Sequence, residues 1–80
     1  MKTAVITGGA TGIGLATAKK YLSSGYHVIA AGIDYEELPE GMEFIQTDVT
    51  KPEEVTRLID SAGQIDVLVN CAGIIMQARE

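Results

Sequence analysis

A glycine-rich stretch near the N-terminus, Thr7–Gly14, constrains the fold of this chain more than any other feature. It follows an apolar, β-favouring run, Thr3–Thr7, and precedes a helix-like run, Leu15–Ser24. The glycines at positions 8, 12 and 14 let the backbone turn sharply and approach a ligand closely. A helix that begins at such a turn presents unpaired N–H groups and the positive end of its dipole. The stretch therefore predicts a strand, a tight turn and a helix whose first turn binds a phosphate group.

Composition and motif spacing exclude several other interpretations. Six basic and eleven acidic residues give a net charge of −5, which argues against electrostatic binding to nucleic acid or to an anionic membrane. The apolar runs are too short to span a bilayer, and no signal peptide is recognisable. The single cysteine, Cys71, cannot form an intrachain disulfide, which favours a reducing cytoplasm. Gly9 and Gly14 have the glycine spacing of a Walker A loop, but Leu15 stands where that loop requires lysine.

The rest of the chain alternates strand-like and helix-like runs. The first helix is expected from about Gly12 to Ser24, with Gly25 as its C′ residue. Apolar runs predict three further strands, at His27–Ala31, Glu43–Thr47 and Ile65–Asn70. The connection between the second and third strands has room for one helical turn, Tyr35–Leu38, before Pro39 interrupts it.

A second helix is predicted between the third and fourth strands. Thr50 is expected to be its N-cap, with Glu53 completing a capping box and Pro52 in the first turn. Apolar residues then recur at i, i+3, i+4 and i+7, a stripe that would pack on a sheet. They are Val55, Leu58, Ile59 and Ala62. Gly63 is expected to end this helix.

This order of elements predicts an α/β fold with a parallel sheet and right-handed crossovers. For a Rossmann-type domain the four strands would lie in the order 3-2-1-4, with the ligand at the carboxyl ends of strands 1 and 4. Thr7–Gly14 and Asn70–Gly73 both lie at those ends. Residues 1–80 are thus expected to form one partial dinucleotide-binding domain, truncated relative to the full doubly wound fold.

Three motifs together give the chain a family resemblance. Thr-Gly-x-x-x-Gly-Ile-Gly at Thr7–Gly14, Asp48-Val49 and Asn-x-Ala-Gly at Asn70–Gly73 occur in this order. The chain resembles the N-terminal part, about the first third, of a short-chain dehydrogenase/reductase. The resemblance implies an NAD(P)-dependent oxidoreductase that transfers a hydride to or from an alcohol or carbonyl.

The resemblance also implies a role for each matching residue. The pyrophosphate and the adenosine ribose would be lined by Gly8, Thr11, Gly12, Ile13 and Gly14. Asp48 would hydrogen-bond the adenine amino group, with Val49 beside the ring. The fourth strand and a cofactor ribose would be held by Asn70, Ala72 and Gly73, and Cys71 stands where family members often have a second asparagine.

The family's catalytic Tyr-x-x-x-Lys pair is absent from these residues. Tyr21, Tyr26 and Tyr35 are followed four positions later by Gly, Ala and Pro, so none matches. The catalytic residues are expected beyond Glu80. Two functional classes remain open: the cofactor-binding part of an oxidoreductase, and a non-catalytic module that binds nucleotide weakly or only self-associates.

The choice between NAD and NADP depends on Asp34. An acidic residue about 20 positions after the glycines binds the ribose 2′-OH and disfavours a 2′-phosphate, and Asp34 lies 34 − 14 = 20 positions after Gly14. The family usually places this acid nearer Gly32, at the end of the second strand. NADP-preferring members often carry a basic residue where this chain has Thr11. NAD is therefore favoured over NADP.

Several candidate residues have a purely structural alternative. Asp34 is also explained as a solvated turn acid, Asp48 as a helix-approach residue, and Asn70 as a tie between neighbouring strands. The acidic pairs Glu36-Glu37 and Glu53-Glu54 are typical of solvated faces or of charge at a helix N-terminus.

The fourth strand is apolar and would leave an open edge, which is a template for pairing with another chain. The chain is therefore expected to form a homo-oligomer through this strand or through Ile74–Met76.

Overall fold

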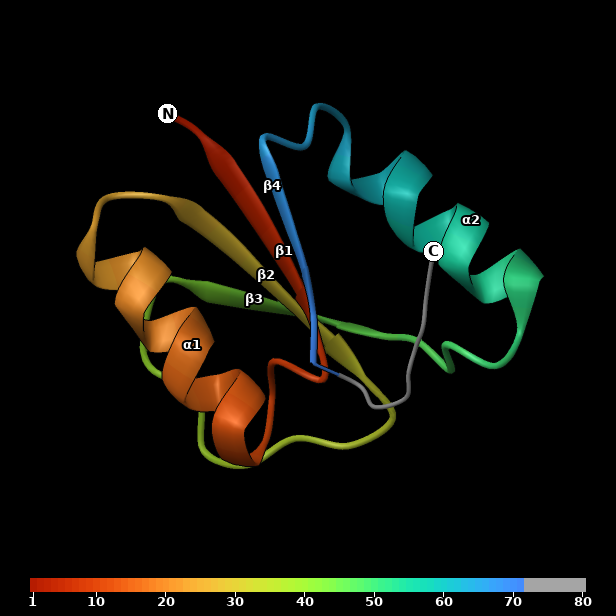
Figure 1. The fold of residues 1–80 in the computed structure, drawn as a ribbon, viewed down its shortest axis with the longest axis horizontal. Coiled ribbons are helices and arrows are strands. Elements are labelled where there is room, and N and C mark those ends of the chain that lie inside the picture. The colour runs from red at the N-terminus through yellow and green to blue at the C-terminus, as the bar shows by residue number, and fades with distance from the viewer. Residues whose placement is uncertain (72–80) are drawn as a thin grey trace.

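The computed structural model describes residues 1–71, which form a four-stranded parallel sheet and two helices (Figure 1). In chain order the elements are β1 (Thr3–Thr7), α1 (Gly12–Ser23), β2 (His27–Gly32), β3 (Met42–Gln46), α2 (Pro52–Ala62) and β4 (Val67–Asn70). The strands lie in the order β3-β2-β1-β4, and each neighbouring pair is parallel. The predicted α/β class, parallel sheet and strand order are confirmed.

The two helices cover opposite faces of the sheet. On one face Ala18 of α1 packs against Ala4, Ile6 and Val28. On the other face Leu58 of α2 packs in a cluster with three strand residues, Val5, Ile29 and Ala31. Since successive strand residues point to opposite faces, both faces must be apolar, which explains the unbroken apolar run in β1.

The connection between β2 and β3 differs from the prediction. No helical turn forms at Tyr35–Leu38. Instead the Glu36 N–H donates to the carbonyl of Ala10 at 2.9 Å, and the ring of Tyr35 lies 4.8 Å from that of Phe44, centroid to centroid. These contacts hold the irregular connection against the glycine-rich turn and against β3.

The start of α2 also differs from the prediction. Lys51, not Thr50, is the N-cap residue, and it makes no side-chain capping bond. The Thr50 hydroxyl donates instead to Asp48 Oδ1 at 2.6 Å, so it is engaged before the helix begins. Glu54, not Glu53, reaches back, and its Oε1 accepts from the Asp48 N–H at 2.8 Å. The predicted capping box is therefore wrong.

The predicted apolar stripe of α2 is only partly buried. Leu58 is 1% exposed, but Ile59 is 37% exposed. Leu58 packs in the cluster with Val5, Ile29 and Ala31, and Ala62 packs against that cluster, so only part of the stripe faces the strands. Gly63, with φ of 72°, follows the helix as predicted. Gly25, with φ of 90°, follows Ser24 after α1, also as predicted.

Candidate functional site

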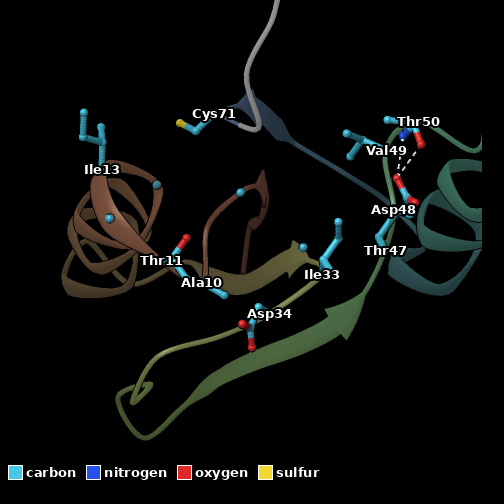
Figure 2. A pocket seen from close by; sticks show the side chains of 14 residues that line it. Ala10, Thr11, Ile13, Ile33, Asp34, Thr47, Asp48, Val49, Thr50 and Cys71 are labelled. Carbon is cyan, nitrogen blue, oxygen red and sulfur yellow. Dashed lines mark hydrogen bonds between the residues drawn. The ribbon is translucent and has the colours of Figure 1, made fainter.

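A groove of about 580 Å³ opens at the carboxyl ends of the strands (Figure 2). Its wall is formed by the glycine-rich turn, the end of β2, the segment after β3, and Cys71 after β4. The strand order reverses between β1 and β4, and such a reversal is where open α/β sheets bind ligands. Eight predicted site residues line the groove: Gly8, Thr11, Gly12, Ile13, Gly14, Asp34, Asp48 and Val49.

The glycine-rich turn is held tightly against β1 and β2. The Gly8 N–H donates to the carbonyl of Ala31 at 2.6 Å, and Gly8 has φ of 70°. A Cβ atom on Gly14 would lie 1.8 Å from the carbonyl oxygen of Gly8, so only glycine allows α1 to pack on the turn. This close packing brings the backbone of both segments to the groove surface, as a phosphate-binding turn requires.

The first turn of α1 supplies amide groups to the groove. Thr11 is the N-cap residue but makes no side-chain capping bond, and the first turn contains no acidic residue. The positive end of the helix dipole is thus not neutralised from within the helix. Its nearest described carboxylate comes from the β2–β3 connection, where Glu36 Oε1 accepts from the Gly12 N–H at 3.4 Å. The side chain of Ile13 is 82% exposed at this edge.

Asp48 lies on the opposite wall, after β3. Its Oδ1 accepts from the hydroxyl of Thr50 at 2.6 Å and from the Thr50 N–H at 3.0 Å. The hydroxyl bond, then the backbone bond, and to a smaller degree the charge of Lys51 hold the pKa of Asp48 below its ordinary value of 3.8. Asp48 therefore presents a carboxylate that remains an acceptor at neutral pH, beside Val49, which is 40% exposed.

Asp34 lies at the end of the groove nearest β2. Its side chain is exposed, and its Oδ1 accepts from the N–H of Tyr35 at 2.9 Å. Because β2 ends at Gly32, the carboxylate comes from the connection and not from the strand itself. The local bond to Tyr35 fits the turn-acid interpretation, whereas its place on the groove wall fits the ribose-binding interpretation.

Asn70 ties β4 to β1 beside the groove and does not line it. The Thr7 hydroxyl donates to Asn70 Oδ1 at 2.8 Å, and the Cys71 N–H donates to the carbonyl of Thr7 at 2.9 Å. These bonds match the structural alternative for Asn70. Ala72 and Gly73, also predicted site residues, lie outside the described residues.

Sequence reasoning missed further wall residues and the contact of Glu36. The wall also contains Ala10, Gly32, Ile33, Thr47, Thr50 and Cys71. Most of them stand beside a motif residue, so their positions gave a usable signal. Glu36 gave none, since nothing in the spacing of an acidic pair indicates that one carboxylate reaches a helix 24 residues earlier.

The three tyrosines are packing residues and do not line the groove. The rings of Tyr21 and Tyr26 meet edge to face, 5.0 Å apart, and both pack against the core on the α1 side. Tyr35 packs against Phe44. Within residues 1–71 the groove therefore has amide donors and carboxylate acceptors for a polar ligand, but no tyrosine to act as an acid or base.

Comparison with known proteins gives one consistent family. The sequence pattern described as short chain dehydrogenase matches residues 2–80. An uncharacterised oxidoreductase of Staphylococcus haemolyticus is 34% identical over 90 residues, which cover 98% of this chain and 39% of that protein.

Solved structures agree with the sequence comparison. An aldohexose dehydrogenase of Thermoplasma acidophilum in ligand-free form is 35% identical with a TM-score of 0.82, over 98% of this chain and 32% of that one. A short chain dehydrogenase of Leptospira borgpetersenii with bound NAD+ is 32% identical with a TM-score of 0.77, over 91% and 32% of the two chains. The chain thus spans less than two fifths of the length of these relatives.

Proposed function

We propose that residues 1–80 are the dinucleotide-binding part of a short chain dehydrogenase and that the groove binds NAD, because this chain belongs to the short chain dehydrogenase family of oxidoreductases. The observation that carries the proposal is the contact between the glycine-rich turn and α1, where Gly14 leaves no room for a side chain. That contact puts backbone amides at the surface of a groove at the strand-order reversal.

Each wall of the groove has a proposed role. The amides of Gly12, Ile13 and Gly14 hold the pyrophosphate, since the helix N-terminus favours negative charge. Asp48 accepts a hydrogen bond from the adenine amino group, with Val49 against the ring. Asn70 orients the end of β4 through Thr7, while roles for Gly8 and Thr11 at the turn, and for Ala72 and Gly73 after β4, follow from the family pattern.

The cofactor would supply the hydride donor or acceptor. For a protein that contains this part we propose hydride transfer between the dinucleotide and an alcohol or carbonyl. Residues 1–71 contribute binding and orientation, and the acid that would move a proton at the substrate oxygen is not among the groove residues.

Asp34 supports NAD in preference to NADP. A carboxylate on the wall accepts a hydrogen bond from a ribose 2′-OH and repels a 2′-phosphate. Thr11, where a basic residue would favour the phosphate, is uncharged. The relative with bound NAD+ is consistent with this choice.

Titration of the 80-residue chain with NADH, followed by its fluorescence, tests the proposal. We expect a saturable signal for the native chain and for Ser23→Thr, which adds one methyl group at an exposed position at the far end of α1. Gly14→Ala should lose the signal, because its Cβ would displace the turn. Absence of a saturable signal for the native chain at millimolar NADH would refute cofactor binding by this chain.

We also propose a cytoplasmic location and self-association. The cytoplasm is supported by a single cysteine, which gives no intrachain disulfide. No helix within residues 1–71 is long and apolar enough to cross a membrane. Self-association through the outer edge of β4 is supported by Leu68, which is 55% exposed.

A further inference from the structure

The N-terminus of α1 receives a carboxylate from a different element. Glu36 Oε1 accepts from the Gly12 N–H, a long hydrogen bond of 3.4 Å, although the two residues are 24 positions apart. The helix has no side-chain cap of its own and no acid in its first turn. Glu36 therefore provides the negative charge that a helix N-terminus favours.

The β2–β3 connection holds this carboxylate in place. The Glu36 N–H donates to the carbonyl of Ala10, inside the glycine-rich turn, at 2.9 Å. The neighbouring Tyr35 packs against Phe44 of β3. In Figure 1 the connection runs past the N-terminal end of α1 on its way from β2 to β3. The chain is thus anchored at residues 35 and 36, and from there the carboxylate reaches Gly12.

We propose that Glu36 is a resident anion at the α1 N-terminus, which a dinucleotide must displace. This inference rests on the proposed function, in which the pyrophosphate occupies the amides of the first turn. Two negative groups at one amide repel each other, so the Glu36 carboxylate has to leave Gly12 when the pyrophosphate arrives. Glu36 thereby weakens the binding of any dinucleotide.

Glu36 and Asp34 thus have different effects. The pyrophosphate is common to NAD and NADP, so Glu36 lowers the affinity for both by the same factor. Asp34 discriminates between them through the ribose. For an exposed charge at a helix end, removal of Glu36 should tighten binding by roughly two- to fivefold.

Paired variants test this proposal in the 80-residue chain. Glu36→Gln removes the charge and retains the shape, and Glu37→Gln makes the same charge change at the next residue. We expect Glu36→Gln to bind both NADH and NADPH about two- to fivefold more tightly, and Glu37→Gln to bind as the native chain does. Glu36→Asp, which keeps the charge but shortens the side chain, should also bind more tightly. Equal affinities for all four chains would overturn the proposal.

Inorganic pyrophosphate, followed at the Gly12 amide by NMR, separates this inference from the proposed function. If the native chain binds no NADH, the proposed function fails. Even then, Glu36→Gln must shift the Gly12 amide resonance from its position in the native chain. It must also bind pyrophosphate more tightly than Glu37→Gln does. An unmoved resonance, or no gain in pyrophosphate affinity, would refute the role of Glu36 whatever NADH does.

Discussion

Asp34 is the residue whose two interpretations differ most in their consequences. If its carboxylate meets the ribose, Asp34→Asn should reduce the preference for NADH over NADPH by about fivefold, because a charge-assisted bond and a repulsion are both lost. Fluorescence titration with the two cofactors measures the ratio, and Glu40→Gln, on the same connection but outside the groove, controls for net charge. A ratio that stays unchanged would leave Asp34 as a turn acid that bonds Tyr35.

Thr50 sets the acidity of Asp48. Removing its hydroxyl in Thr50→Val takes away the largest cause of the lowered pKa, so the pKa of Asp48 should rise toward 3.8. The backbone bond from residue 50 remains, which makes the rise partial. Carboxyl ¹³C NMR during an acid titration measures it. Thr56→Val, which removes a hydroxyl bonded to the carbonyl of Pro52, should leave this pKa unchanged.

The lowered pKa of Asp48 also makes the stability of the fold depend on pH. A carboxyl whose pKa is lower in the folded than in the unfolded chain stabilises the fold above its unfolded pKa. That stabilisation is complete above about 3.8 and is lost as the pH falls through the lowered folded value. The native chain should therefore lose more stability than Thr50→Val between pH 5 and pH 2, as measured by urea unfolding. Parallel losses in the two chains would contradict the assignment.

At the scale of the element, the beginning of α2 separates a charge effect from a hydrogen bond. Glu53 and Glu54 both lie in the first turn, so both interact favourably with the helix dipole. Only Glu54 also accepts from the Asp48 N–H. Glu54→Ala should therefore cost about 1 kcal/mol more than Glu53→Ala in the free energy of unfolding. Urea unfolding of the two variants at neutral pH measures the difference, and equal losses would mean that the bond to Asp48 adds nothing.

The boundaries of the strands and helices show which element ends a sequence can predict. β1 was predicted at its observed residues because an apolar run buried on both faces ends at glycines. Gly25 and Gly63 marked the ends of helices correctly because few other residues tolerate their positive φ. Thr50 does not cap α2 because its hydroxyl donates to Asp48, and the spacing Thr-x-x-Glu cannot distinguish this bond from one accepted from a backbone N–H of the helix.

At the scale of the molecule, the strand order predicted where the motifs would meet. Thr7–Gly14 and Asp48-Val49 are far apart in the chain, yet they face the same groove because parallel strands end at one edge of the sheet. The contact of Glu36 with Gly12 could not be predicted in this way. It depends on the path of an irregular connection, which follows from bonds to Ala10 and packing on Phe44 rather than from any periodic pattern.

The two edges of the sheet differ in how well they resist pairing with a second copy of the chain. β3 carries the exposed Glu43 and Gln46, and polar side chains protect an edge. In β4 three apolar residues, Val67–Val69, precede Asn70, and within residues 1–71 this strand pairs only with β1. Leu68 shares its face with Val5, its partner in register, but is 55% exposed. Self-association should therefore involve β4 and not β3.

Substitution of Leu68 by lysine tests this asymmetry. Leu68→Lys puts a charge on the apolar face beside the open edge, so it should shift the chain from dimer to monomer at high micromolar concentration, as measured by light scattering. Ser23→Lys, on the helix that covers the other face, adds the same charge away from β4 and should leave the dimer intact. Since Leu68 is more than half exposed, the fold should lose little stability in the variant. A native chain that is already monomeric at that concentration would exclude association through this edge. If Leu68→Lys and Ser23→Lys both dissociate the dimer, the effect is due to net charge and not to the edge of β4.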